Sequence, residues 1–221
     1  MPKIIVMIGP PGVGKGTQSR LLAEHFSFPQ ISTGDILREM SRMETRLGLQ
    51  IKAAQAAGQL VSDEVLASVI LTRTTQPDCR KGYILDGYPR TLVQARMLEK
   101  LARGQGKQVC LVSIVVPREA LMRRLTGRRT CLECGEIYNI YLRPPKQDGV
   151  CDSCGAWLTH RADDNAETVG ARLAAYEIAT APLIEFYRQG EALIEVNGDR
   201  DVQDVFADIC SLVEAKTPKS E

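Results

Sequence analysis

Residues 4–18 read IIVMIGPPGVGKGTQ. The first five are apolar and mostly β-branched, which predicts a strand buried on both faces. A glycine-rich turn follows at 9–17, and the pattern then predicts a helix over 17–26. A glycine-rich loop between a strand and a helix is the context of a P-loop, where backbone N–H groups and the helix start surround a phosphate. This part of the chain therefore predicts a nucleotide-phosphate site.

The loop itself carries one departure from the general P-loop pattern. Lys15 supplies a full positive charge for the terminal phosphates, but Gly16 separates it from Thr17, whereas the general motif places the hydroxyl directly after the lysine to hold magnesium. A magnesium ligand must then lie elsewhere, and Asp86, at the end of an apolar strand over 82–86, is the candidate, directly or through water. Its alternative role is that of a turn or helix-capping aspartate. We expect the ATP phosphates on Gly12, Val13, Gly14, Lys15, Gly16 and Thr17.

Strand and helix patterns alternate along most of the chain. Further strands are expected at 29–32, 82–86, 109–116 and 192–196. Helices are expected between 33 and 57, over 63–75 with Ser62 as its cap, up to 101, and over 118–126, 167–189 and 202–213. This alternation predicts an α/β fold, a parallel β-sheet P-loop NTPase core flanked by helices. Residues 127–164 lack helical periodicity, so we expect a core of 1–126 and 165–221 with an insertion at 127–164.

Composition narrows the class of protein. The 221 residues include 28 basic and 27 acidic side chains, and 44% are hydrophobic, which excludes a disordered or fibrous chain. A net charge of +1 argues against nucleic acid as a partner held by the whole surface. No apolar run reaches the ~20 residues of a membrane span, and the first apolar segment is too short for a signal peptide. We expect a cytoplasmic protein with no membrane partner.

Four of the seven cysteines form two C-x-x-C-G units, with sixteen residues between them. The four are Cys131, Cys134, Cys151 and Cys154. Paired thiolates at this spacing predict a tetrahedral zinc site, and about 38 residues need such a link because they bury little apolar surface. Two pairs of reduced or disulfide-bonded cysteines, or a redox role, are the alternatives. His160 is expected at the surface, and the remaining cysteines and histidine as structural residues: Cys79, Cys110, Cys210 and His25.

Five motifs in order resemble those of the adenylate kinases, within the nucleoside monophosphate kinases. They are GPPGVGKGT at 9–17, QISTGDILR at 30–38, DGYPR at 86–90, GRR at 127–129, and RADD at 161–164 followed by Arg172. The resemblance runs from residue 4 to the last helix and matches the long-lid form with a four-cysteine zinc site. It implies Mg²⁺-dependent transfer of the γ-phosphoryl group of ATP to AMP by a monomer, with residues 127–164 as a lid that closes and excludes water.

The resemblance also implies roles for individual residues. The AMP site, centred on residues 32–61, would comprise Thr33, Gly34, Arg38, Gly58, Gln59, Leu60, Val61, Gly87, Arg90, Gln94, Arg161 and Arg172. The catalytic set would be Lys15, Arg90, Arg124, Arg128, Arg161 and Arg172, with Arg128 also on ATP. Arginines suit this task because each can fork onto phosphate oxygens, and Gln94 can form two hydrogen bonds to an adenine edge. Asp163 and Asp164 would orient arginines or magnesium water, or serve as hinge carboxylates.

Other functions stay open from the sequence. A CMP or UMP kinase would share the chemistry, but those relatives usually have a short lid and alanine in place of Thr33. A zinc-ribbon module that binds nucleic acid is supported only by the cysteine units and by Arg128 and Arg129. A pseudoenzyme that serves as a regulatory partner is the third alternative, although each motif position carries a competent residue.

Overall fold

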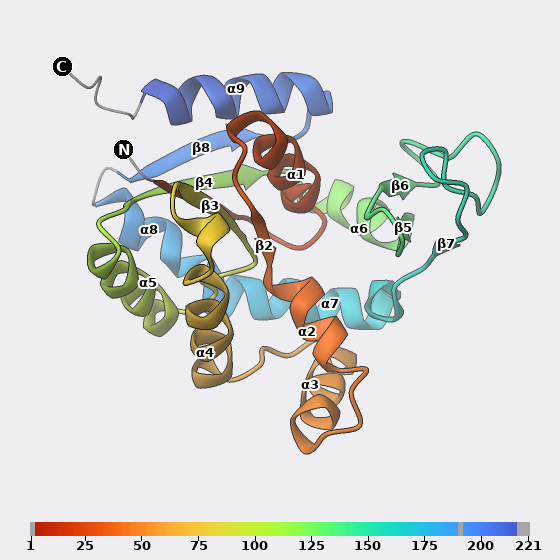
Figure 1. The fold of residues 1–221 in the computed structure, drawn as a ribbon. Helices are drawn as coiled ribbons and strands as arrows, with labels where there is room; N and C mark the ends of the chain where they lie inside the picture. Colours follow the sequence, from red (N-terminus) through yellow and green to blue (C-terminus); the bar gives the residue numbers. More distant parts are fainter. Residues whose placement is uncertain (1–2, 190–191, 216–221) are drawn as a thin grey trace.

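The computed structural model describes residues 3–189 and 192–215. At its centre lies a five-stranded sheet with the order β2-β3-β1-β4-β8, in which all neighbouring strands are parallel (Figure 1). The strands are β1 (Lys3–Ile8), β2 (Gln30–Ser32), β3 (Gly82–Asp86), β4 (Gln108–Val115) and β8 (Leu193–Asn197). The parallel sheet expected from the alternating pattern is confirmed.

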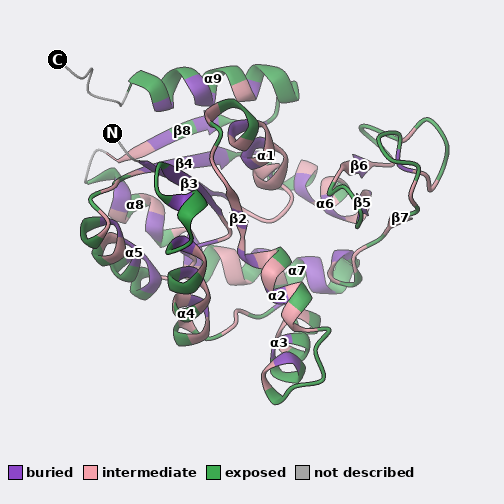
Figure 2. Ribbon diagram, viewed as in Figure 1, coloured by how far each residue is buried: buried purple, intermediate pink, exposed green. Residues whose placement is uncertain are grey.

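Helices cover both faces of this sheet. One face carries α1 (Lys15–Phe26), α6 (Arg118–Thr126), α7 (Ala166–Ala175) and α9 (Val202–Ala215); the other carries α2 (Thr33–Met40), α3 (Arg46–Ala56), α4 (Asp63–Thr74), α5 (Leu92–Gly104) and α8 (Pro182–Arg188). Side chains of β1 alternate between the two cores: Ile5 and Met7 enter the first, and Ile4, Val6 and Ile8 the second. All six residues of β1 are buried (Figure 2), which explains its continuous apolar run.

Three helical expectations need correction. The helical region between 33 and 57 is two helices, α2 and α3, and the Ser62 side chain forms no capping hydrogen bond to α4. The long helix expected over 167–189 is interrupted by a π-helix at Tyr176–Thr180, where the Ala181 N–H donates to the Tyr176 carbonyl at 2.9 Å. Pro182 begins α8 and has no N–H, so an unbroken α-helical ladder cannot pass through it.

Residues 127–164, which we call the lid, form a separate small sheet. Its strands β5 (Arg128–Cys131), β6 (Ile137–Asn139) and β7 (Leu158–Thr159) pair antiparallel in the order β6-β5-β7. Figure 1 shows the lid, in green to teal, projecting from the body beyond α6 and α7. Two short 3₁₀ turns, Pro77–Cys79 and Ala162–Asp164, complete the elements of the described residues. Among the described residues, no helix has the length and apolar character to cross a membrane.

Candidate functional site

The glycine-rich loop connects β1 to α1 at the carboxyl edge of the sheet. Gly9, Gly12 and Gly14 have φ values of +146°, +84° and +103°, which side-chain-bearing residues rarely adopt. A Cβ on Gly12 would also lie 2.7 Å from Leu125 Cγ. Lys15 begins α1, and its Nζ donates to the carbonyls of Gly9 at 2.8 Å and Pro10 at 3.0 Å. The loop therefore curls tightly around the lysine, as a P-loop does.

The charges around Lys15 are predominantly positive. The pKa of Lys15 is lowered to about 8, mainly by burial; Asp86 opposes this change, and the guanidinium groups of Arg90, Arg172 and Arg128 add to it. Burial likewise raises the pKa of Asp86, although Lys15 opposes this change. Relative to solution, the neutral forms of Lys15 and Asp86 are both favoured, because the surrounding protein compensates neither charge fully. An anion placed among these cations would supply the missing compensation.

Two arginines of this cluster are held by one buried carboxylate. Asp164 has no exposed surface; it accepts hydrogen bonds from Arg128 Nε at 2.7 Å and Nη2 at 2.5 Å, and from Arg172 Nη1 at 2.9 Å. Arg172 Nη1 also donates to the Asp163 carbonyl at 2.8 Å and lies 3.1 Å from Asp163 Oδ2. Burial opposes ionisation of Asp163, but Arg172 and other arginines outweigh it and lower its pKa. Both aspartates thus pair with arginines, which agrees with the first of the three expected roles, and that role stays a prediction.

Thr33 and Arg90 converge on the end of β3. Thr33 Oγ1 lies 3.2 Å from the Asp86 carbonyl and 3.0 Å from the Gly87 carbonyl, while Arg90 Nε donates to the Gly87 carbonyl at 2.9 Å. Gly87 has φ +84°, and a Cβ there would lie 2.8 Å from Thr33 Oγ1 and 3.0 Å from Arg90 Nη2. Only glycine fits between these two side chains, so the DGYPR motif has a steric reason for its second residue.

Arg161 extends from the lid toward α2. Its Nε donates to Thr130 Oγ1 at 3.2 Å, and its Nη2 lies 3.9 Å from Asp35 Oδ1, the carboxylate that also pairs with Arg38. Burial lowers the pKa of Arg161 to about 10, and the nearby charges of Arg128 and Arg38 contribute. Arg38 and Arg161 therefore meet at one acid, Asp35.

The segment 58–61 closes this side by contact with α7. Gly58 has φ +67°, and a Cβ there would lie 3.0 Å from Ala171 Cβ, 3.1 Å from the Thr168 carbonyl and 3.3 Å from Arg172 Cγ. The backbone at Gly58 thus lies directly against the helix that carries Arg172. This contact brings the expected AMP segment next to the arginine cluster.

Two of the expected site residues, Arg124 and Gln94, hydrogen bond to other parts of the protein. Arg124 donates to the Gly198 carbonyl at 3.2 Å and pairs with Asp199 at 3.1 Å, so its guanidinium binds the turn after β8. Gln94 has no exposed surface, and its amide binds the protein itself. Its partner Asp63 was not identified from the sequence, although the T-x-x-Q spacing of Thr91 and Gln94 is that of a capping box and indicates a bonded glutamine.

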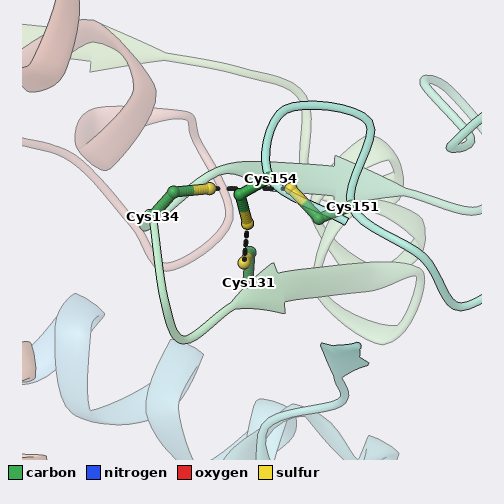
Figure 3. A group of neighbouring side chains, drawn as sticks. All are labelled: Cys131, Cys134, Cys151 and Cys154. Atoms are coloured by element: carbon green, nitrogen blue, oxygen red, sulfur yellow. Dashed lines mark hydrogen bonds between the residues drawn. The ribbon is translucent and has the colours of Figure 1, made fainter. Parts of the chain in front are cut away.

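The four lid cysteines converge as predicted (Figure 3). Their sulfur atoms all lie within 4.8 Å of one another, and none is joined in a disulfide: the Cys131–Cys154 and Cys134–Cys151 sulfur distances are 3.4 and 3.5 Å. Sulfurs placed tetrahedrally 2.3 Å from zinc would be about 3.8 Å apart, so this donor set fits the ion. The N–H groups of Gly135 and Gly155 donate to the carbonyls of Cys131 and Cys151, so the two C-x-x-C-G units fold alike.

The remaining cysteines and histidines mostly lie as expected. His160 is exposed, and Cys79, Cys110 and Cys210 are buried. His25 does have a polar partner, which the sequence did not reveal: its Nε2 lies 3.2 Å from Glu214 Oε1. Its ring also packs edge-on against Phe26 and Phe206, so its role is structural.

Comparison with known proteins was made over the whole chain. A family model described as "Adenylate kinase" matches residues 7–192. A protein of Nitrosococcus oceani named adenylate kinase is 47% identical over 211 residues, covering 95% of this chain and 97% of that protein. Proteins named adenylate kinase from Archaeoglobus fulgidus and Bacillus subtilis are each 44% identical to this chain. Each alignment covers 95% of this chain and 97% of the relative. These similarities extend over both the sheet and the lid.

Proposed function

Because the chain belongs to the adenylate kinase family, we propose that it transfers the γ-phosphoryl group of ATP to AMP and yields two ADP. The reaction would depend on Mg²⁺ and on closure of the lid. As a member of this family the chain is a phosphotransferase, and the proposal concerns its substrates and how its residues act. The proposal includes a monomer that acts in the cytoplasm, as the resemblance implies.

The observation that carries the proposal is the cluster of cations around the P-loop. Arg90, Arg128 and Arg172 come from three separate elements, yet all three act on Lys15 strongly enough to contribute to its lowered pKa. Asp164 and Asp86 offset part of this like charge, and an anionic ligand would compensate the rest. Two nucleotides whose phosphate chains meet between the P-loop and Arg90 would provide that charge.

The chain's residues then act by positioning and charge neutralisation. Backbone N–H groups of the loop and Lys15 would bind the donor phosphates, while Arg90 and Arg38 bind the acceptor phosphate. Arg128, Arg161 and Arg172 would neutralise charge that develops on the equatorial oxygens of the transferred group, where one arginine contributes about 10³–10⁵ in rate in related enzymes. No general base is needed. Mg²⁺ would supply further positive charge for the phosphates, and Asp86 would hold it, directly or through water.

Lid closure would exclude water, which otherwise competes as acceptor for the phosphoryl group. The lid contacts the core helix α1: Arg20 Nη1 lies 2.7 Å from Glu136 Oε2, and a Cβ on Gly16 would lie 3.6 Å from Ile137 Cδ1. Residues 127–164 would move as one unit against a core of 1–126 and 165–221. Structural zinc on the four cysteines would hold that unit together and leave no ligand position open for catalysis.

The acceptor is tested by a direct comparison of AMP, CMP, UMP and GMP with ATP as donor. We expect ADP formation with AMP to exceed that with each other acceptor. Thr33 supports AMP over the pyrimidine monophosphates because its hydroxyl hydrogen bonds at the end of β3, a contact that alanine could not form. Equal or faster phosphorylation of CMP would overturn the assignment.

A further inference from the structure

Gln94 is bonded at every polar atom. Its backbone N–H donates to Thr91 Oγ1 at 3.1 Å, and its backbone carbonyl accepts from the Tyr88 hydroxyl at 3.3 Å. In the side chain, Oε1 accepts from the Arg90 N–H at 2.7 Å, and Nε2 donates to Asp63 Oδ1 at 2.7 Å. Gln94 has no exposed surface, so these bonds set the orientation of its amide before any base arrives.

Asp63 and the backbone N–H of Arg90 together determine that orientation. An ionised carboxylate only accepts hydrogen bonds, so the amide must turn its NH₂ toward Asp63 and its oxygen toward the Arg90 N–H. The Thr91 hydroxyl, 3.2 Å from both Asp63 oxygens, holds the carboxylate in place. Asp63 begins α4 and Thr91 precedes α5, so the acid joins the first turns of two helices.

The same network fixes the backbone of Arg90. Its N–H is bound by Gln94, and its carbonyl accepts from Thr180 Oγ1 at 2.9 Å. Thr180 is the last residue of the π-helix between α7 and α8. The arginine expected to bind the acceptor phosphate is therefore held from both sides, and Asp63 supports one of them through Gln94.

We propose that Asp63 is a positioning residue that makes the acceptor site selective for adenine, an inference that rests on the proposed function of Gln94 and Arg90 in AMP binding. The Gln94 carboxamide makes one hydrogen bond at Oε1 and one at Nε2. One lone pair on its oxygen and one N–H on its nitrogen are therefore left for a base. That pair matches adenine, which offers the N6 amine as donor and N1 as acceptor. Hypoxanthine offers the reverse, O6 as acceptor and N1–H as donor, and matches the flipped amide.

The test is Asp63→Asn, with Glu64→Gln as the matched control. Asparagine has the same shape but presents a donor as well as an acceptor, so of the two contacts that orient the Gln94 amide only the one to the Arg90 N–H still requires a single orientation. Glu64→Gln removes the same charge from the same first turn of α4, at an exposed position. We expect Asp63→Asn to raise KM for AMP about tenfold and to lower the preference for AMP over IMP about tenfold, with KM for ATP changed less than about twofold.

Asp63→Ser, whose side chain is too short to reach the Gln94 amide, is measured in the same way if the asparagine variant does not fold. Unchanged KM for AMP and unchanged AMP-to-IMP preference in the folded variant would overturn the inference, as would equal effects of Glu64→Gln. A uniform rise in KM for both ATP and AMP would also overturn it, because it would indicate general damage. The parent enzyme separates the two hypotheses: if it fails to phosphorylate AMP, the proposed function itself is wrong.

Discussion

Asp164 and Arg128 form a bidentate ion pair at 2.7 and 2.5 Å, and the aspartate has no exposed surface. The same carboxylate binds Arg172 at 2.9 Å, so one buried anion orients an arginine at the lid's edge and another on α7. Planar guanidinium groups need such a partner because their reach onto phosphate depends on orientation. The position of both arginines therefore depends on a residue that itself has no access to substrate in this conformation.

Asp164→Asn tests this dependence. We expect kcat to fall at least about 100-fold and the free energy of unfolding to fall by about 3 kcal/mol, because removal of one partner leaves buried charges uncompensated. Activity assays and urea unfolding measure the two effects. Asp163→Asn is the control and should lower kcat and the free energy of unfolding by less, since Asp163 is partly exposed and its backbone carbonyl still binds Arg172. Equal losses in the two variants would contradict the central place of Asp164.

The lowered pKa of Lys15 implies that activity depends on pH. Its pKa of about 8 means that the ammonium is charged below pH 8 and loses its charge as the pH rises through 8. The value of kcat/KM for ATP, which reports the free enzyme, should therefore fall about tenfold per pH unit above 8. The decline in kcat should start at higher pH because bound phosphate raises the pKa of the lysine. A kcat/KM profile that stays flat to pH 9.5 would contradict the assignment.

Glu136 links the lid to the core, so we expect its substitution to change turnover. Only 12% of its side chain is exposed, and it pairs with Arg20 on α1 at 2.7 Å and with Arg143 of the lid at 2.9 Å. Glu136→Gln should favour the open lid, raising KM for ATP about threefold and, where lid opening limits turnover, raising kcat about twofold. Steady-state kinetics measure both. Glu133→Gln, at an exposed lid position, should leave both unchanged; an unaltered KM in Glu136→Gln would refute the link.

Removal of metal should affect the lid before the core. Chelation should release one zinc ion per chain and lower the unfolding temperature by more than about 5 °C, while some ADP formation persists below that temperature. Zinc analysis and thermal unfolding measure the two effects, and added zinc should restore the original unfolding temperature. Cys134→Ser should reproduce the loss without a chelator. A chain that contains no zinc and is insensitive to chelation would exclude the structural role.

Much of this architecture follows from local sequence patterns. The strand over 4–8, the P-loop and the two C-x-x-C-G units each depend on neighbouring residues, and the structure confirms the buried strand, the glycine-dependent turn and the convergence of the four cysteines. The elements that escaped prediction depend on contacts distant in sequence. The π-helix at Tyr176–Thr180 places the Thr180 hydroxyl on the carbonyl of Arg90, ninety residues earlier, and helical periodicity does not encode that requirement.

The same distinction applies to the site. Lys15 and Arg90 occupy recognisable motifs, but the partner of Gln94 is Asp63, thirty-one residues away on another helix. Both Arg124 and Arg128 were expected in the catalytic set, yet Arg124 contacts the turn at Gly198 after β8, because it lies on α6 whereas Arg128 already belongs to β5. Motifs therefore indicated which residues matter, whereas the pairing of acids with arginines required the fold. The role of each residue in nucleotide binding stays a prediction.

The most direct test of the account is ADP formation from ATP and AMP by Lys15→Met. The variant should unfold no earlier than the parent at pH 7, because the lowered pKa shows that the charged lysine costs stability in the folded chain below pH 8. With folding intact, we expect the rate to fall by about a thousandfold or more. Phosphoryl transfer at the parental rate would contradict the claim that this P-loop holds the donor phosphates.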